Sequence, residues 1–112
     1  ASRAGAGTVI RGGVARGIPR MPRENLEQVP DGFRPMIQAR LDRFENAGLD
    51  DILNGMSRME FMLRFTLTHP EMHTTIVGTA NPRHFADNLA AASKGPLPED
   101  VYEAARKRLD AI

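Results

Sequence analysis

The chain has 112 residues, of which 41% are hydrophobic and 26% charged, and its net charge is +1. This composition is typical of one small, soluble globular domain. The absence of cysteine excludes disulfides, thiolate catalysis and Cys-ligated zinc. No apolar run approaches the roughly 20 residues needed to cross a membrane, so we expect a cytoplasmic protein with no membrane partner.

The charge is unevenly distributed. Residues 1–43 carry eight Arg and four acidic residues, whereas residues 44–112 carry seven basic and ten acidic residues. A basic arm can bind nucleic acid, but here the arginines are scattered among glycines and prolines, without a basic helix or an aromatic stacking platform. We therefore expect a solvated surface and no nucleic-acid partner.

The first half of the chain predicts one strand, one loop and one helix. The β-branched run Thr8–Ile10, bounded by glycines, predicts a buried strand. Residues 17–32 contain three prolines and few apolar residues, which indicates a loop. Helical spacing of apolar residues predicts a helix over 34–46, which Gly48 ends.

The second half predicts a strand between helices. A helix over 56–68 begins with a capping box of Ser57 and Glu60 and stops at Pro70. The run at 74–77 predicts the second strand. Two further helices are predicted, one over 82–93 and a terminal one over 98–111. The helix over 82–93 is capped by Asn81 and is expected to bury a stripe of Phe85, Leu89 and Ala92.

The order of these elements predicts an α/β fold. Two strands separated by helices imply a parallel pair with a right-handed crossover. Parallel strands need cover on both faces and neighbours at both edges, and two of them do not make a stable sheet. The sequence therefore predicts part of a larger sheet.

Several segments, in this order and spacing, resemble the C-terminal third of an aldo-keto reductase. They are IRGGVARG at 10–17, residues 56–70, IVGTANPRHFADN at 76–88 and KGPLP at 94–98. The resemblance implies the last two βα units of a (β/α)₈ TIM barrel plus a C-terminal helix, an incomplete barrel. Its strands would be 8–14 and 74–77, and its helices 56–68, 82–93 and the outer 98–111.

The resemblance also implies a site for NADPH. Arg11 would lie against the nicotinamide, where many relatives have an aromatic residue. The other implied contacts are Gly12 and Val14 along the pyrophosphate, Gly78 and Thr79 at the 2′-phosphate and ribose, His84 at the adenine or its phosphate, and Asp87 and Asn88 at the adenine amino edge. Many relatives have lysine at the Gly78 position and arginine at the His84 position.

Catalytic residues are not expected in this chain. The family's acid is a tyrosine assisted by lysine, aspartate and histidine from earlier strands. The only tyrosine here is Tyr102, in the predicted terminal helix, and the only lysines are Lys94 and Lys107. The chain is thus expected to be the cofactor-binding part of an NADP(H)-dependent oxidoreductase, inactive alone. The alternative is a non-catalytic α/β domain that self-associates or completes a barrel with a partner chain.

Two further patterns have simpler explanations than a ligand site. The glycines before residue 18 match neither GxGxxG nor a P-loop, and turn geometry accounts for them about as well as phosphate contact does. His69 and His73 are four residues apart, but Pro70 prevents the helix that would align them on one face. We expect no metal site.

Overall fold

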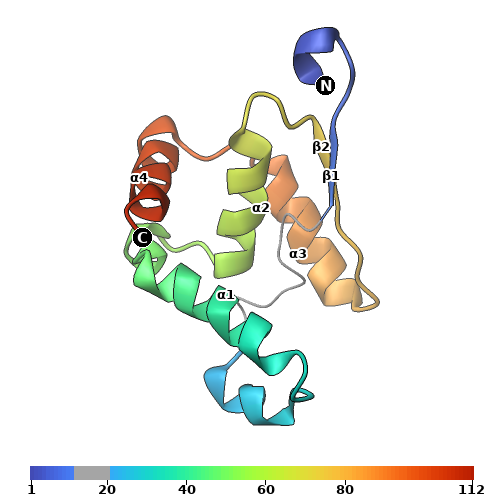
Figure 1. Ribbon diagram of the computed structural model, residues 1–112. Coiled ribbons are helices and arrows are strands. Elements are labelled where there is room, and N and C mark those ends of the chain that lie inside the picture. Colours follow the sequence, from blue (N-terminus) through green and yellow to red (C-terminus); the bar gives the residue numbers. More distant parts are fainter. Residues whose placement is uncertain (12–20) are drawn as a thin grey trace.

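The computed structural model describes residues 1–11 and 21–112 and has a mixed α/β fold (Figure 1). Its strands are β1 (Val9–Arg11) and β2 (Thr74–Ile76), which pair in parallel with Ile10 opposite Thr75. The described helices, in chain order, are α1 (Arg34–Asn46), α2 (Arg58–Thr68), α3 (Pro82–Ser93) and α4 (Glu99–Asp110). Short 3₁₀ turns occur at η1 (Ser2–Ala4), η3 (Arg23–Gln28) and η4 (Leu49–Ile52).

Helix α2 lies at the centre of the described structure. Figure 1 shows it between α4 on one side and α3 with the two strands on the other. The ring of Phe65 in α2 lies 5.1 Å from the ring of Tyr102 in α4, and 6.2 Å from that of Phe61. Such aromatic contacts stabilise a core beyond the area they bury, and here they join the two helices.

The hydrophobic core is built away from the sheet. It lies among the end of α1, η4, α2 and α4, and its buried members are Phe44, Ala47, Leu49, Phe61, Leu97, Val101, Tyr102 and Ala105. The half-buried Met56 and Met62 pack against it, as expected of methionines that fill irregular gaps. Every buried side-chain N or O atom in the described part of the chain has a hydrogen-bond partner.

Local signals set most helix ends correctly. Helices α1 and α3 form with the predicted bounds, and α2 begins two residues later than predicted because Ser57 caps it, its Oγ accepting from the N–H of Glu60. The Asn81 Oδ1 accepts from the N–H of Arg83 at the start of α3. The carboxylate of Glu60 accepts from Lys94 and Arg64 instead of completing the predicted capping box.

The prediction of a buried first strand is wrong. In both strands the middle residue is half-buried and the outer two are exposed, and Val9 and Ile76 are 61% and 60% exposed. Among residues 1–11 and 21–112, no second layer packs on the face that carries them. Described residues of the predicted strands 8–14 and 74–77 form three-residue strands, and residues 12–14 lie outside the described residues.

The predicted buried stripe of α3 is also wrong, since Phe85, Leu89 and Ala92 are all exposed. Ala91 is the one residue of this helix that is buried. These three residues have helical spacing, but no segment within the described residues packs over them. The predicted loop over 17–32 contains the turn η3, because i→i+3 bonds can form between its prolines; residues 17–20 lie outside the described residues. No helix in the described ranges is long and apolar enough to span a membrane.

Phe61 and Phe85 form a matched pair for testing where the stability lies. Phe61→Ala removes a side chain that is 2% exposed in the core, and should lower the free energy of unfolding by roughly 3–5 kcal/mol. Phe85→Ala, at a position 58% exposed, should change it by less than about 0.5 kcal/mol. Urea unfolding followed by circular dichroism measures both. Equal losses would show that α3 contributes to the core as the sequence predicts.

Candidate functional site

A groove of about 770 Å³ lies between the segment Met21–Arg23, the beginning of α2 and one face of α3. Glu45 of α1 also lines it, so segments distant in sequence enclose the groove. Its lining is Met21, Pro22, Arg23, Glu45, Ser57, Arg58, Met59, Glu60, His84, Asp87, Asn88, Ala90, Ala91 and Lys94. This size and this mixture of apolar and polar side chains are typical of sites for small molecules.

Three of the sequence-predicted site residues lie together in this groove. His84, Asp87 and Asn88 are spaced i, i+3 and i+4, which places them on one face of α3. They present an imidazole, a carboxylate and an amide, so the face offers both donors and acceptors. Within the described residues, no cation pairs with the Asp87 carboxylate.

The other predicted residues that the structure describes, Arg11, Gly78 and Thr79, do not line this groove. Gly78 and Thr79 are exposed where the chain leaves β2, and the Thr79 Oγ1 accepts from the N–H of Asn81. Arg11 is exposed at the end of β1 and borders a separate cavity of about 240 Å³ beside Phe65. Gly12 and Val14 lie outside the described residues.

Two backbone N–H groups at the start of α3 already donate hydrogen bonds within the chain. A free helix N-terminus attracts anions through its N–H groups and its dipole. Here the N–H of Asn81 donates to Thr79 and the N–H of Arg83 donates to the Asn81 side chain. Those two donors are therefore occupied within the chain.

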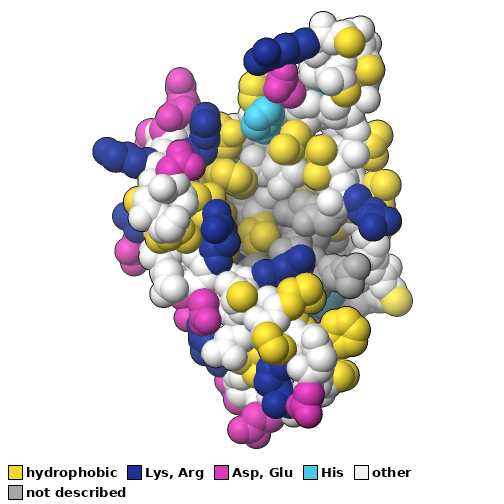
Figure 2. Space-filling view, in the orientation of Figure 1, with side chains coloured by type: hydrophobic (Ala, Val, Ile, Leu, Met, Phe, Trp, Pro, Cys, Tyr) yellow, Lys and Arg dark blue, Asp and Glu magenta, His cyan; other side chains and the backbone are white. Residues whose placement is uncertain are grey.

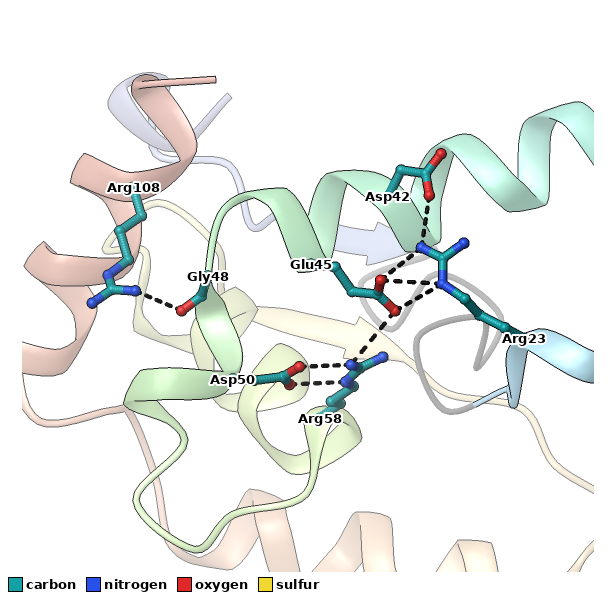
Figure 3. Close-up of polar contacts among 7 residues, drawn as sticks. All are labelled: Arg23, Asp42, Glu45, Gly48, Asp50, Arg58 and Arg108. Carbon is teal, nitrogen blue, oxygen red and sulfur yellow. Dashed lines mark hydrogen bonds and ion pairs between the residues drawn. The ribbon is translucent and has the colours of Figure 1, made fainter.

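Arg23, Glu45 and Arg58 of the groove lining belong to a network of ion pairs. Figure 3 shows this network. The Arg23 Nη2 lies 2.7 Å from carboxylate oxygens of both Asp42 and Glu45. The Arg58 Nη2 lies 2.6 Å from Asp50 and 3.8 Å from Glu45, so Glu45 is shared by both arginines. This network fixes Met21–Arg23 to α1 and α1 to α2.

The network raises the pKa of both arginines. Hydrogen bonds from Arg23 to Glu45 and then to Asp42 raise the pKa of Arg23, and the hydrogen bond to Asp50 raises that of Arg58. Both guanidinium groups are therefore charged at any pH at which the protein is folded. The guanidinium of Arg58 also lies 4.9 Å from the centre of the Phe44 ring, which couples the network to the core.

A second set of ion pairs includes Glu60 and Lys94 of the groove lining. The Lys94 Nζ, at the end of α3, lies 3.0 Å from the Glu60 carboxylate. The same carboxylate lies 3.3 Å from Arg64, whose Nε and Nη2 also donate to the carbonyls of Gly95 and Pro96. Helices α2 and α3 are thereby tied together. Sequence reasoning missed the contacts of Lys94 with Glu60 and of Arg64 with Gly95 because their members lie 34 and 31 residues apart.

His69 and His73 each accept a hydrogen bond from a backbone N–H group. The Nδ1 of His73 accepts from the N–H of Thr8, and the Nδ1 of His69 accepts from the N–H of Glu71. Thr8 also accepts from the N–H of His73 and donates to the carbonyl of Glu71. These bonds attach the start of β1 to the approach to β2. The described residues contain no group of three or more potential metal ligands.

The lining of the groove offers several hydrogen-bonding groups. Tyr102 is buried in the core against Phe65 and does not line the groove. The α3 face can accept from an amino or hydroxyl group at Asp87 and donate and accept at Asn88. Together with apolar Met21 and Met59, these groups suit a planar heterocycle with a polar edge.

Comparison with known proteins finds no matching family model, no matching curated protein and no matching solved structure.

Glu45→Gln tests whether the arginine network holds Met21–Arg23 in place. The substitution removes the charge that Arg23 and Arg58 share, so it should lower the melting temperature at low ionic strength. In 1 M NaCl, where the Debye length is about 3 Å, the difference should disappear. Glu27→Gln, a matched change in the exposed part of η3, should have no effect at either salt concentration. A loss independent of salt would instead indicate a packing role for Glu45.

Proposed function

We propose that this chain is the C-terminal, cofactor-binding part of an aldo-keto reductase, an oxidoreductase dependent on a nicotinamide dinucleotide. NADPH is the form of the cofactor that the resemblance implies. The chain would form the last two βα units and the outer C-terminal helix of a (β/α)₈ barrel. It would contribute binding and orientation of the cofactor, and no proton transfer.

One observation carries this proposal: His84, Asp87 and Asn88 line a single groove with Met21–Arg23. The resemblance assigns all three side chains to the adenosine half of the cofactor, and it does so from sequence order alone. Their grouping beside a segment that follows β1 gives that half one continuous surface. The amide and carboxylate fit the donor and acceptor edge of adenine.

The uncovered face of the β1–β2 pair supports the barrel part of the proposal. Val9 and Ile76 project from this face at 61% and 60% exposure, while Ile10 and Thr75 on the other face are half-buried. Strands of a parallel barrel are buried on both faces, with one set of side chains filling the interior. The exposed set would be that interior set. The exposed Phe85 and Leu89 of α3 would meet a neighbouring helix or strand.

In the complete enzyme the bound nicotinamide would supply hydride chemistry toward a carbonyl carbon. Residues of this chain would hold the adenosine half in the groove through Asp87 and Asn88. The ion pairs of Arg23 and Arg58 would hold the segment Met21–Arg23 beside it. Rigid support of this kind orients a cofactor for reaction.

Asn88→Ala tests the groove directly. Loss of one hydrogen bond to adenine should weaken binding of adenosine 5′-monophosphate about fivefold, by isothermal titration calorimetry. Asn46→Ala, the matched change at the exposed end of α1, should leave the affinity unchanged. Equal affinities for the two variants would contradict adenosine binding at this face.

A non-catalytic domain that self-associates is the second candidate. It is favoured by the exposed apolar residues Val9, Ile76, Phe85 and Leu89, since uncovered strands and apolar faces promote association. Figure 2 shows hydrophobic side chains distributed over the visible surface, including its margin beside the strands.

The intact mass of the protein from its natural source distinguishes the two candidates. The barrel proposal expects a mass well above the 12.3 kDa of this chain, because a TIM barrel has roughly 200 residues or more. The second candidate expects 12.3 kDa by mass spectrometry and an oligomer in sedimentation velocity. A monodisperse 12.3-kDa monomer would contradict both.

A further inference from the structure

We infer that Asn54 is a site of spontaneous modification, at which the Asn54–Gly55 dipeptide deamidates to aspartate and isoaspartate without an enzyme. The observation behind it is the conformation of one exposed turn between η4 and α2. The inference is independent of the cofactor proposal, because neither residue of the dipeptide is assigned to the cofactor.

Asn54 and Gly55 occupy the two central positions of a tight turn. The N–H of Met56 donates to the carbonyl of Leu53 at 3.0 Å, which closes the turn. The φ angles of Asn54 and Gly55 are 51° and 83°. Positive φ at both central positions is what a type I′ turn requires, and Asn-Gly is the sequence that favours it. Both residues are exposed to solvent.

The reaction needs only these two residues and water. After losing its proton to hydroxide, the backbone nitrogen of Gly55 attacks the side-chain carbonyl carbon of Asn54. The new N–Cγ bond closes a succinimide ring, and the Cγ–Nδ2 bond breaks, so that the side-chain nitrogen takes up a proton and leaves as ammonia. Water then adds to either ring carbonyl. One opening gives aspartate, and the other gives isoaspartate, in which the backbone runs through the former side chain.

The geometry at Gly55 favours this attack. Glycine has no Cβ to obstruct ring closure, and no described atom lies within 4 Å of the position that a Cβ would occupy. The hydrogen bond that closes the turn uses the N–H of Met56, so it does not engage the attacking nitrogen. Exposed turns of this kind are also where a chain tolerates local rearrangement.

Asn46, at the end of α1, is a matched comparison within the same chain. It is also exposed, but the residue that follows it, Ala47, is buried and has a Cβ. The N–H of Ala47 donates to the carbonyl of Arg43. Attack at Asn46 would break this helical hydrogen bond and move a buried residue, so we expect Asn46 to stay intact.

Conversion to isoaspartate should disturb the packing on both sides of the turn. Leu53 and Met56 are half-buried and pack against the hydrophobic core. Isoaspartate lengthens the backbone between them by one carbon, and a close-packed core does not absorb such a shift without loss of contacts. The turn also leads directly to Ser57, which caps α2 and lines the groove.

Incubation of the full 112-residue chain at 37 °C tests the inference. Samples kept at pH 5 and at pH 8 are digested with trypsin and compared with an unincubated sample by mass spectrometry. The tryptic peptide 44–58 contains both Asn46 and Asn54. We expect a gain of one mass unit that fragment ions assign to Asn54, at least about tenfold faster than at Asn46 and faster at pH 8 than at pH 5.

Two further measurements separate the contribution of the fold from that of the dipeptide. In guanidinium chloride the rate at Asn54 should rise by less than about threefold, because the turn already exposes the attacking nitrogen. Gly55→Ala adds a Cβ and should slow conversion by at least about tenfold. Far-UV circular dichroism shows whether this variant folds, and the Cβ obstructs the attack in either case.

The effect on packing is measured by thermal unfolding. Asn54→Asp adds the negative charge without lengthening the backbone, so it is the matched control for the isoaspartate form. The isoaspartate form, separated by chromatography, should melt several degrees below Asn54→Asp.

Conversion at Asn54 in the folded chain, with Asn46 intact, supports the inference. It is overturned if the folded chain stays unmodified over a period in which the unfolded chain converts, since the turn would then protect the dipeptide. Equal rates at Asn46 and Asn54 also overturn it. Equal melting temperatures of the isoaspartate form and Asn54→Asp would overturn the predicted effect on packing.

Discussion

Packing of α2 against its neighbours is the interaction on which the rest of the described structure depends. Through Phe61 and Phe65 this helix joins α4 and the end of α1, and it also contacts β2 and α3. Phe61 of this helix is buried in the core, and Met62 and Phe65 pack against the other buried members. Burial of large apolar side chains of this kind dominates the free energy of folding. The two strands lie to one side of this core, and none of its buried members belongs to them.

This asymmetry explains both the exposed surfaces and the position of the groove. Because the core lies among α1, α2 and α4, the outer face of the strands and the outer stripe of α3 remain in contact with solvent. Phe85 and Leu89 show the same pattern as Val9 and Ile76, namely apolar residues at regular spacing without a covering layer. The polar face of α3 turns instead toward Met21–Arg23 and forms the groove.

Charged side chains have a structural role in this protein. Glu45 holds two arginines from different segments, and Glu60 holds Lys94 and Arg64. Such pairs at a surface contribute modestly to stability, but they define how elements distant in sequence are placed. Glu45 and Glu60 also line the groove, so the same carboxylates that position these elements set part of its charge.

The sequence by itself determined the local structure. Ser57, Asn81 and Pro82 set the starts of α2 and α3, and Gly48 and Gly95, both with positive φ, follow the ends of α1 and α3, because caps and turns depend on residues a few positions apart. The spacing of His84, Asp87 and Asn88 likewise placed them on one helical face. The order of strands and helices also determined the parallel pairing of β1 and β2.

Only the tertiary structure decided which apolar faces are covered and which charges meet. Hydrophobic spacing shows that a face can be buried, but burial needs a partner, and for Val9, Ile76, Phe85 and Leu89 the described residues provide none. The pairs of Arg23 with Glu45 and of Glu60 with Lys94 join residues 22 and 34 positions apart. Contacts over such separations depend on how the helices pack, which no local pattern records.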